Sequence, residues 1–97
     1  FVGWSGPLHR TEPGQPMGVA RGSADLSGVN LRNARMVRVL CSGCSLRDAD
    51  LSGADLTRAS LSGADLRGAD LQRARLVATS LVGADLRGAN LEGAILS

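Results

Sequence analysis

Two cysteines spaced as C-x-x-C, Cys41 and Cys44, are the residues of this sequence whose types and spacing most suggest chemistry. In a redox enzyme this spacing at a helix N-terminus lowers the pKa of a thiol and makes it reactive. A zinc site would need two more ligands, and the one histidine, His9, lies far away beside Arg10. We therefore expect His9 to be a surface residue rather than a metal ligand or a catalytic base.

The other polar residues form no recognisable catalytic set. The sequence has no Ser-His-Asp or Cys-His arrangement, no carboxylate pair in an identifiable cleft and no phosphate-binding loop, because most Asp and Gly residues recur at regular intervals. We predict a protein that is not an enzyme and has no catalytic residues, metal site, cofactor or small-molecule substrate. The alternative, a redox protein that uses Cys41 and Cys44, requires thiols that react with alkylating reagents in the native state.

A period of five residues runs without a break from Ala24 to Ser97 and determines how every side chain is positioned. When every fifth residue from position 26 is taken as a centre, thirteen of the fifteen centres are Leu, and the residue two before is Ala in eleven. An unbroken period of this length predicts a repeat architecture. The centres form the predicted core ladder: Leu26, Leu31, Met36, Cys41, Leu46, Leu51, Leu56, Leu61, Leu66, Leu71, Leu76, Leu81, Leu86, Leu91 and Leu96.

Neither regular element can bury a row with this period. An α-helix advances about 100° per residue, so the Leu row would drift around all its sides. A flat strand alternates with period two, so successive Leu residues would point to opposite faces. A chain that turns a corner every five residues can bury the centre and the residue two before it, with the polar residue between them outside and Gly at the corner.

These repeats resemble the pentapeptide-repeat family, whose motif is A-(D/N)-L-x-x. Matches include Ala54-Asp55-Leu56, Ala64-Asp65-Leu66 and Ala89-Asn90-Leu91. The resemblance covers residues 24–97 and implies an all-β fold, a right-handed quadrilateral β-helix solenoid of about four coils with four repeats in each coil. The outward Asp or Asn is replaced by Arg35, Leu40, Arg75 and Ile95, which leaves the core positions unchanged.

The 97 residues predict one domain with two parts. Residues 1–23 form an irregular N-terminal segment or cap, which holds all three Pro and both aromatic residues, and residues 24–97 form the β-helix. The net charge is +2, with eleven Arg and no Lys, and no apolar run approaches membrane-spanning length. Contact with a membrane is therefore expected only indirectly, through a complex.

Residues twenty apart should stack, and one of the four resulting faces carries no charge. Its outward residues are Leu40, Ser60 and Ser80, followed by Ser42, Ser62 and Val82, and we expect Val37 at its edge. A flat, uncharged face suits contact with another protein, although small polar residues also make an ordinary β-helix surface. The candidate protein-binding residues are Phe1, Trp4, Val37, Leu40, Ser60, Ser80, Val82 and Ile95. Phe1 and Trp4 serve equally well as a cap on the first coil, and the outward Ile95 fits a covered end.

Another face stacks Arg47, Arg67 and Arg87 beside the outward Asp65 and Asp85. A basic stripe can bind phosphate, but these Arg residues lie next to carboxylates, and no aromatic residue of the repeat can stack on bases. We interpret the face as mutually neutralised and expect no nucleic-acid partner.

The period places both cysteines at inward positions, at the two ends of one corner. Turn ends lie within about 7 Å, so a disulfide is sterically possible. Two buried thiols that act as small apolar residues are the simpler interpretation.

The predicted function is that of a structural or adaptor protein, a rigid β-helix that binds other protein subunits. The resemblance suggests an accessory subunit of a photosynthetic or other membrane-bound complex, in a plastid thylakoid or the bacterial cytoplasm. The alternative is a DNA mimic that inhibits or protects gyrase, as some family members do. Those members are acidic, often have Phe centres and dimerise through a C-terminal helix, features that this sequence lacks.

Overall fold

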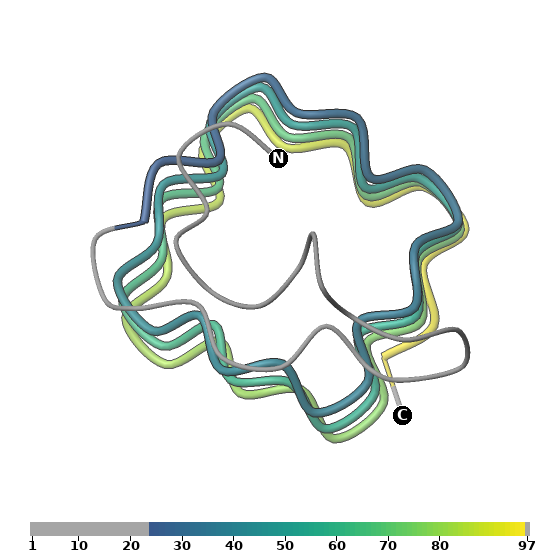
Figure 1. The fold of residues 1–97 in the computed structure, drawn as a ribbon. Helices are drawn as coiled ribbons and strands as arrows, with labels where there is room; N and C mark the ends of the chain where they lie inside the picture. Colours follow the sequence, from purple (N-terminus) through teal and green to yellow (C-terminus); the bar gives the residue numbers. More distant parts are fainter. Residues whose placement is uncertain (1–23, 97) are drawn as a thin grey trace, which may run out of the picture.

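The computed structural model describes residues 24–96, which form a β-helix with four walls (Figure 1). Parallel β-bridges join residues twenty apart, so each coil takes twenty residues. We number the walls in chain order by their bridged residues. Wall 1 contains Asp25, Ser45, Asp65 and Asp85, and wall 2 contains Asn30, Asp50, Asp70 and Asn90. Wall 3 contains Arg35, Asp55, Arg75 and Ile95, and wall 4 contains Leu40, Ser60 and Ser80. Each bridge is a single residue, so residues 24–96 contain no longer strand and no helix.

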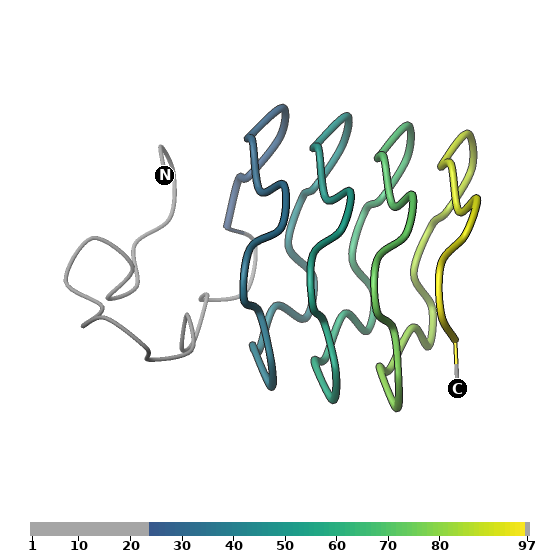
Figure 2. The same cartoon turned by 90° about the vertical axis from the view of Figure 1, so that its right-hand side faces the viewer.

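The coils stack with little lateral shift (Figure 2). The chain runs clockwise in Figure 1, and its N-terminal coil lies nearest the viewer, so the coil is right-handed. No helix in the described part has the length and apolar character needed to cross a membrane.

Backbone hydrogen bonds between coils follow the period. The Leu26 amide donates to the Ser45 carbonyl at 2.7 Å, and the Ser45 amide donates to the Ala24 carbonyl at 2.9 Å. These bonds satisfy the backbone of each wall, as the strands of a wider parallel sheet would do.

A tight turn forms each corner. The Ala54 amide donates to the Leu51 carbonyl at 3.0 Å, and the third turn residue, Gly53, has φ of +69°. This conformation favours Gly because a Cβ atom is crowded there. Six corners nevertheless hold another residue with φ between +58° and +63°: Asn33, Arg38, Asp48, Arg58, Arg73 and Ala78.

The interior consists of the centres and of the small residues two before them. All eleven centres from Leu26 to Leu76 are buried, with at most 2% of their surface exposed. Ala residues such as Ala54 and Ala74 fill the space between them. Because the interior is closely packed, we expect binding sites for other molecules on the outer walls and the ends.

Four members of the predicted core ladder are not fully buried. Leu81 and Leu86 are half-buried and still pack on the core, whereas Leu91 is 36% exposed and Leu96 is 62% exposed. A centre is buried where the centre twenty residues later in the sequence covers it. For these four Leu residues, no such centre lies within the described residues. The expectation that all fifteen centres are buried is therefore wrong for the last coil.

Candidate protein-interaction surfaces

Wall 4 is free of charge, and its polar groups bind one another. The hydroxyl groups of Ser42 and Ser60 are hydrogen-bonded at 2.9 Å, and those of Ser62 and Ser80 at 2.8 Å. Leu40 is 49% exposed at one end of the wall, and Val82 is 77% exposed at the other. The wall therefore offers two apolar side chains separated by hydroxyl groups that already have partners.

The structure brings together Leu40, Ser60, Ser80 and Val82, four of the candidate binding residues, on this wall. Ile95 lies on wall 3, where it is bridged to Arg75. Val37 lines a depression of wall 3 and lies in the turn from Met36 to Val39, the corner between walls 3 and 4, so its role at the edge of the uncharged face stays a prediction. Phe1 and Trp4 lie outside the described residues.

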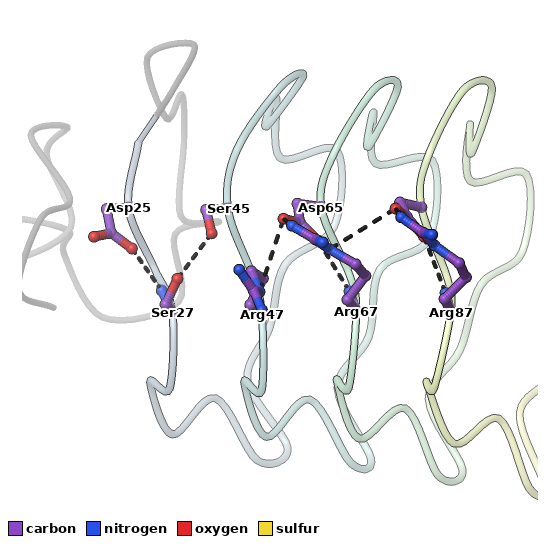
Figure 3. A network of polar contacts seen from close by, with 8 residues as sticks. Asp25, Ser27, Ser45, Arg47, Asp65, Arg67 and Arg87 are labelled. Atoms are coloured by element: carbon purple, nitrogen blue, oxygen red, sulfur yellow. Dashed lines mark hydrogen bonds and ion pairs between the residues drawn. The ribbon is translucent and has the colours of Figure 1, made fainter.

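Wall 1 carries a ladder of alternating charges (Figure 3). Arg67 pairs with Asp65 of its own repeat at 2.6 Å and approaches Asp85 of the next coil at 3.8 Å. Arg87 pairs with Asp85 at 2.6 Å, and Arg47 lies 4.0 Å from Asp65. The three Arg residues therefore lie near carboxylates of their own wall, whose charges balance.

The pKa values of two carboxylates on wall 1 are lowered by their Arg neighbours. A hydrogen bond from the Arg67 side chain, followed by one from its backbone amide, lowers the pKa of Asp65 to about 2 against the opposing effect of burial. The Arg87 side chain does the same for Asp85, whose pKa is also about 2. Charge-assisted, two-pronged contacts favour the charged form in this way.

Wall 2, with its corner to wall 1, is acidic. Asp48, Asp50, Asp70 and Glu92 lie there, and Arg32 is the basic residue, 3.9 Å from Asp50. Asp70 accepts hydrogen bonds from the Gln72 amide at 3.0 Å and the Gln72 side chain at 3.2 Å. The hydroxyl of Ser52 lowers the pKa of Asp50.

Wall 3, with its two corners, is basic and hollowed. A shallow depression of about 400 Å³ lies over the side chains of Val37, Thr57 and Val77, which are stacked at twenty-residue intervals. It is completed by Arg35, Arg38, Arg58 and Ala78. This depression was not predicted from the sequence, although the recurrence of Val, Thr and Val twenty residues apart was a signal for it.

Cys41 and Cys44 are fully buried and joined by a disulfide. Their Cα atoms are 5.3 Å apart across the corner between walls 4 and 1, and the Cys44 amide donates to the Cys41 carbonyl at 3.1 Å. The structure thus has the bonded pair instead of the two free thiols that we considered simpler. Among residues 24–96 no group of three or more His, Cys, Asp or Glu is placed to hold a metal ion.

The walls, the register and the packed Leu and Ala interior define a β-helix of five-residue repeats. The profile of the family described as pentapeptide repeats (8 copies) matches residues 24–63 and 59–97. The chain belongs to the pentapeptide-repeat family. The comparison with curated protein sequences found no match.

Solved structures of the same family are similar to this chain. HetL, a pentapeptide-repeat protein involved in heterocyst differentiation regulation in the cyanobacterium Nostoc, is 39% identical, with a TM-score of 0.78 over 80% of this chain and 37% of HetL. Rfr23 from the cyanobacterium Cyanothece is 30% identical, with a TM-score of 0.60 over 84% of this chain and 59% of Rfr23. The chain therefore spans less than two thirds of the length of either protein.

Proposed function

We propose that this chain is a non-catalytic protein-binding module, whose rigid β-helix presents wall 4 to another protein. The observation that carries the proposal is the uncharged wall with two exposed apolar side chains, Leu40 at 49% and Val82 at 77% exposure. Exposed apolar side chains on a surface without charge favour contact with another protein, and the Ser hydroxyl groups between them already have hydrogen-bond partners. The packed interior supports the same view, because such an interior holds the wall rigid and reduces the entropy lost on binding.

In a finer form of the proposal, the chain is an accessory subunit of a larger, photosynthetic or otherwise membrane-bound complex. The regular Leu-centred repeats, which resemble those of cyanobacterial and plastid members of the family, support this form. The likeness to HetL, which is involved in heterocyst differentiation regulation, supports a regulatory role as a second form of the proposal. The partner would be another protein subunit in either case.

The test is capture of the native complex with a wall 4 variant beside a matched control. Val82→Arg places a charge on the exposed wall 4 position that directly follows a centre. Gln72→Arg changes the equivalent repeat position on the opposite wall 2, where Arg two residues after Asp70 can pair as Arg67 does with Asp65. We expect the tagged wild type and Gln72→Arg to retain one partner of the same mass in native mass spectrometry, and Val82→Arg to lose it. Equal retention by all three proteins would refute the role of wall 4.

A further inference from the structure

Among residues 24–96, most Arg residues that have no carboxylate neighbour on their own wall lie on wall 3 and its corners. Five Arg residues lie there with one outward acid, Asp55, and the corner to wall 2 also contains Arg32 and Glu92. The five are Arg35, Arg38, Arg58, Arg73 and Arg75. Wall 1 is balanced and wall 2 is acidic, so the excess belongs to one side of the β-helix.

Asp55 already has partners. It accepts hydrogen bonds from the backbone amide and the hydroxyl group of Thr57, and it lies 3.9 Å from Arg75. Within residues 24–96, the ion pairs of up to 4.0 Å do not include Arg35, Arg38 or Arg58. The charge of Asp55, the bridged neighbour of Arg35, still acts on Arg35, whereas Arg38 and Arg58 have no carboxylate partner among the described residues.

The same three Arg residues border the depression of wall 3, whose floor is apolar. Val37, Thr57 and Val77 run along the stacking direction, at about 4.8 Å per coil. The outward residues of wall 3 lie on one side of this row, and the corner residues Arg38 and Arg58 lie on the other. The volume of about 400 Å³ is within the range of small binding sites, about 300–1,000 Å³.

Backbone strain is present at the same corner. Arg38 and Arg58 have φ of +63° and +62°, whereas the corner between walls 4 and 1 has Gly43, Gly63 and Gly83 at the equivalent positions. A long side chain in this conformation is unfavourable by about 1–2 kcal/mol relative to its ordinary backbone state. The same conformation occurs at Asn33, Asp48, Arg73 and Ala78. The strain is therefore common to several corners, and wall 3 is distinguished by its charge and its depression.

We propose that wall 3 binds an acidic segment of a partner protein, with an aliphatic side chain over Val37 and Val77 and carboxylates at Arg38 and Arg58. Arg is suited to this role because its guanidinium group donates two parallel hydrogen bonds to a carboxylate. An acidic peptide fits better than a nucleic acid, because the floor is aliphatic and the described residues have no aromatic side chain to stack on bases. This proposal does not depend on the role of wall 4.

The test is a titration of the ¹⁵N-labelled full chain followed by NMR. The probe is the peptide acetyl-Gly-Glu-Asp-Val-Asp-Glu-Gly-amide, and its neutral counterpart has Gln and Asn in place of Glu and Asp. We expect amide shifts concentrated at Val37, Arg38, Thr57, Arg58 and Val77. The neutral peptide should bind about tenfold more weakly or worse, as expected from the loss of charge-assisted hydrogen bonds.

The double variant Arg38→Gly/Arg58→Gly separates binding from folding, because Gly is the usual residue at the corners. It should keep the dispersed spectrum of the wild type and bind the acidic peptide about tenfold more weakly. Arg73→Gly is the matched control, since it removes a charge at the same repeat position outside the depression, and it should bind within about twofold of the wild type.

Four outcomes would overturn the proposal: no shifts, shifts on another wall, equal binding of the neutral peptide, or unchanged binding by the double variant. Tighter binding of a ten-nucleotide oligothymidylate than of the acidic peptide would assign wall 3 to nucleic acid instead.

Discussion

The side chains of Asp65 and Arg67 form two parallel hydrogen bonds, Nε to Oδ1 at 2.8 Å and Nη2 to Oδ2 at 2.6 Å. The backbone amide of Arg67 also donates to Asp65 Oδ1, at 3.2 Å. Asp85 and Arg87 repeat the arrangement one coil later. Because the two residues flank one buried Leu, the sequence D-L-R is sufficient to generate the contact within a single repeat.

The first prediction is a loss of stability in acid. The pKa of Asp65 and of Asp85 is about 2 in the fold, against an ordinary value of 3.8. The unfolded chain therefore binds more protons than the folded chain between about pH 4 and pH 2, and this contribution to the free energy of unfolding is lost as the pH falls through that range. Urea unfolding at pH 5, 3.5 and 2.5 should show the decline.

The double variant Asp65→Asn/Asp85→Asn tests the cause. Asn keeps the local turn, since Asn30 and Asn90 accept the backbone amides of Arg32 and Glu92 at 3.1 and 3.0 Å. The variant should show a shallower pH dependence than the wild type, although Asp25, Asp50 and Asp55, whose pKa values are also lowered, keep part of it. Identical slopes would show that these pairs do not contribute.

The second prediction compares two Leu residues of wall 3. Leu56 is fully buried, so Leu56→Ala should lower the free energy of unfolding by about 2–5 kcal/mol. Leu96 is 62% exposed, so Leu96→Ala should lower it by less than about 1 kcal/mol. Denaturant unfolding of both variants measures the difference, and equal effects would mean that the last coil is covered in solution.

The five-residue period was enough to predict the inward positions and a corner in every repeat, because the same environment recurs each time, whereas the four-walled β-helix followed from the family resemblance. The period could not predict the exposure of Leu91 and Leu96, which depends on whether another coil covers them. It also did not show that Val37, Thr57 and Val77 line one depression, which depends on how the coils stack. The depression on wall 3 arises from this stacking and from the reach of Arg side chains, which no single repeat shows.

The third prediction concerns corners that lack Gly. Ala78 has φ of +58°, so Ala78→Gly relieves about 1–2 kcal/mol of backbone strain and adds about 0.5–1 kcal/mol of unfolded-state entropy. The variant should be more stable by up to about 1 kcal/mol, and Arg58→Gly should behave alike. Thermal unfolding checks both, and a clear destabilisation would contradict the strain argument.

The reverse change should be unfavourable, and more so where a neighbour blocks the new methyl group. A Cβ atom at Gly28, with φ of +71°, meets no atom of residues 24–96 within 4 Å apart from its chain neighbours, so within this part of the chain Gly28→Ala adds only backbone strain, about 1 kcal/mol. At Gly53 it would collide with the Asn33 side chain of the preceding coil. Gly53→Ala should therefore be the less stable variant in urea unfolding, and the double variant Asn33→Gly/Gly53→Ala should recover most of the difference.

The last prediction separates a structural disulfide from a reactive one. Cys41 and Cys44 are fully buried and close a very short loop, and an entropy estimate for a loop of that length gives about 2 kcal/mol. The variant Cys41→Leu/Cys44→Ala installs the prevailing residues of the two repeat positions, so buried Leu surface offsets part of this loss. We expect the variant to fold and to remain within about 2 kcal/mol of the wild type in urea unfolding. The oxidised wild type should show no free thiol either in native buffer or in guanidinium chloride. A protein that uses these cysteines for redox chemistry would instead release thiols in the native state when a mild reductant is added.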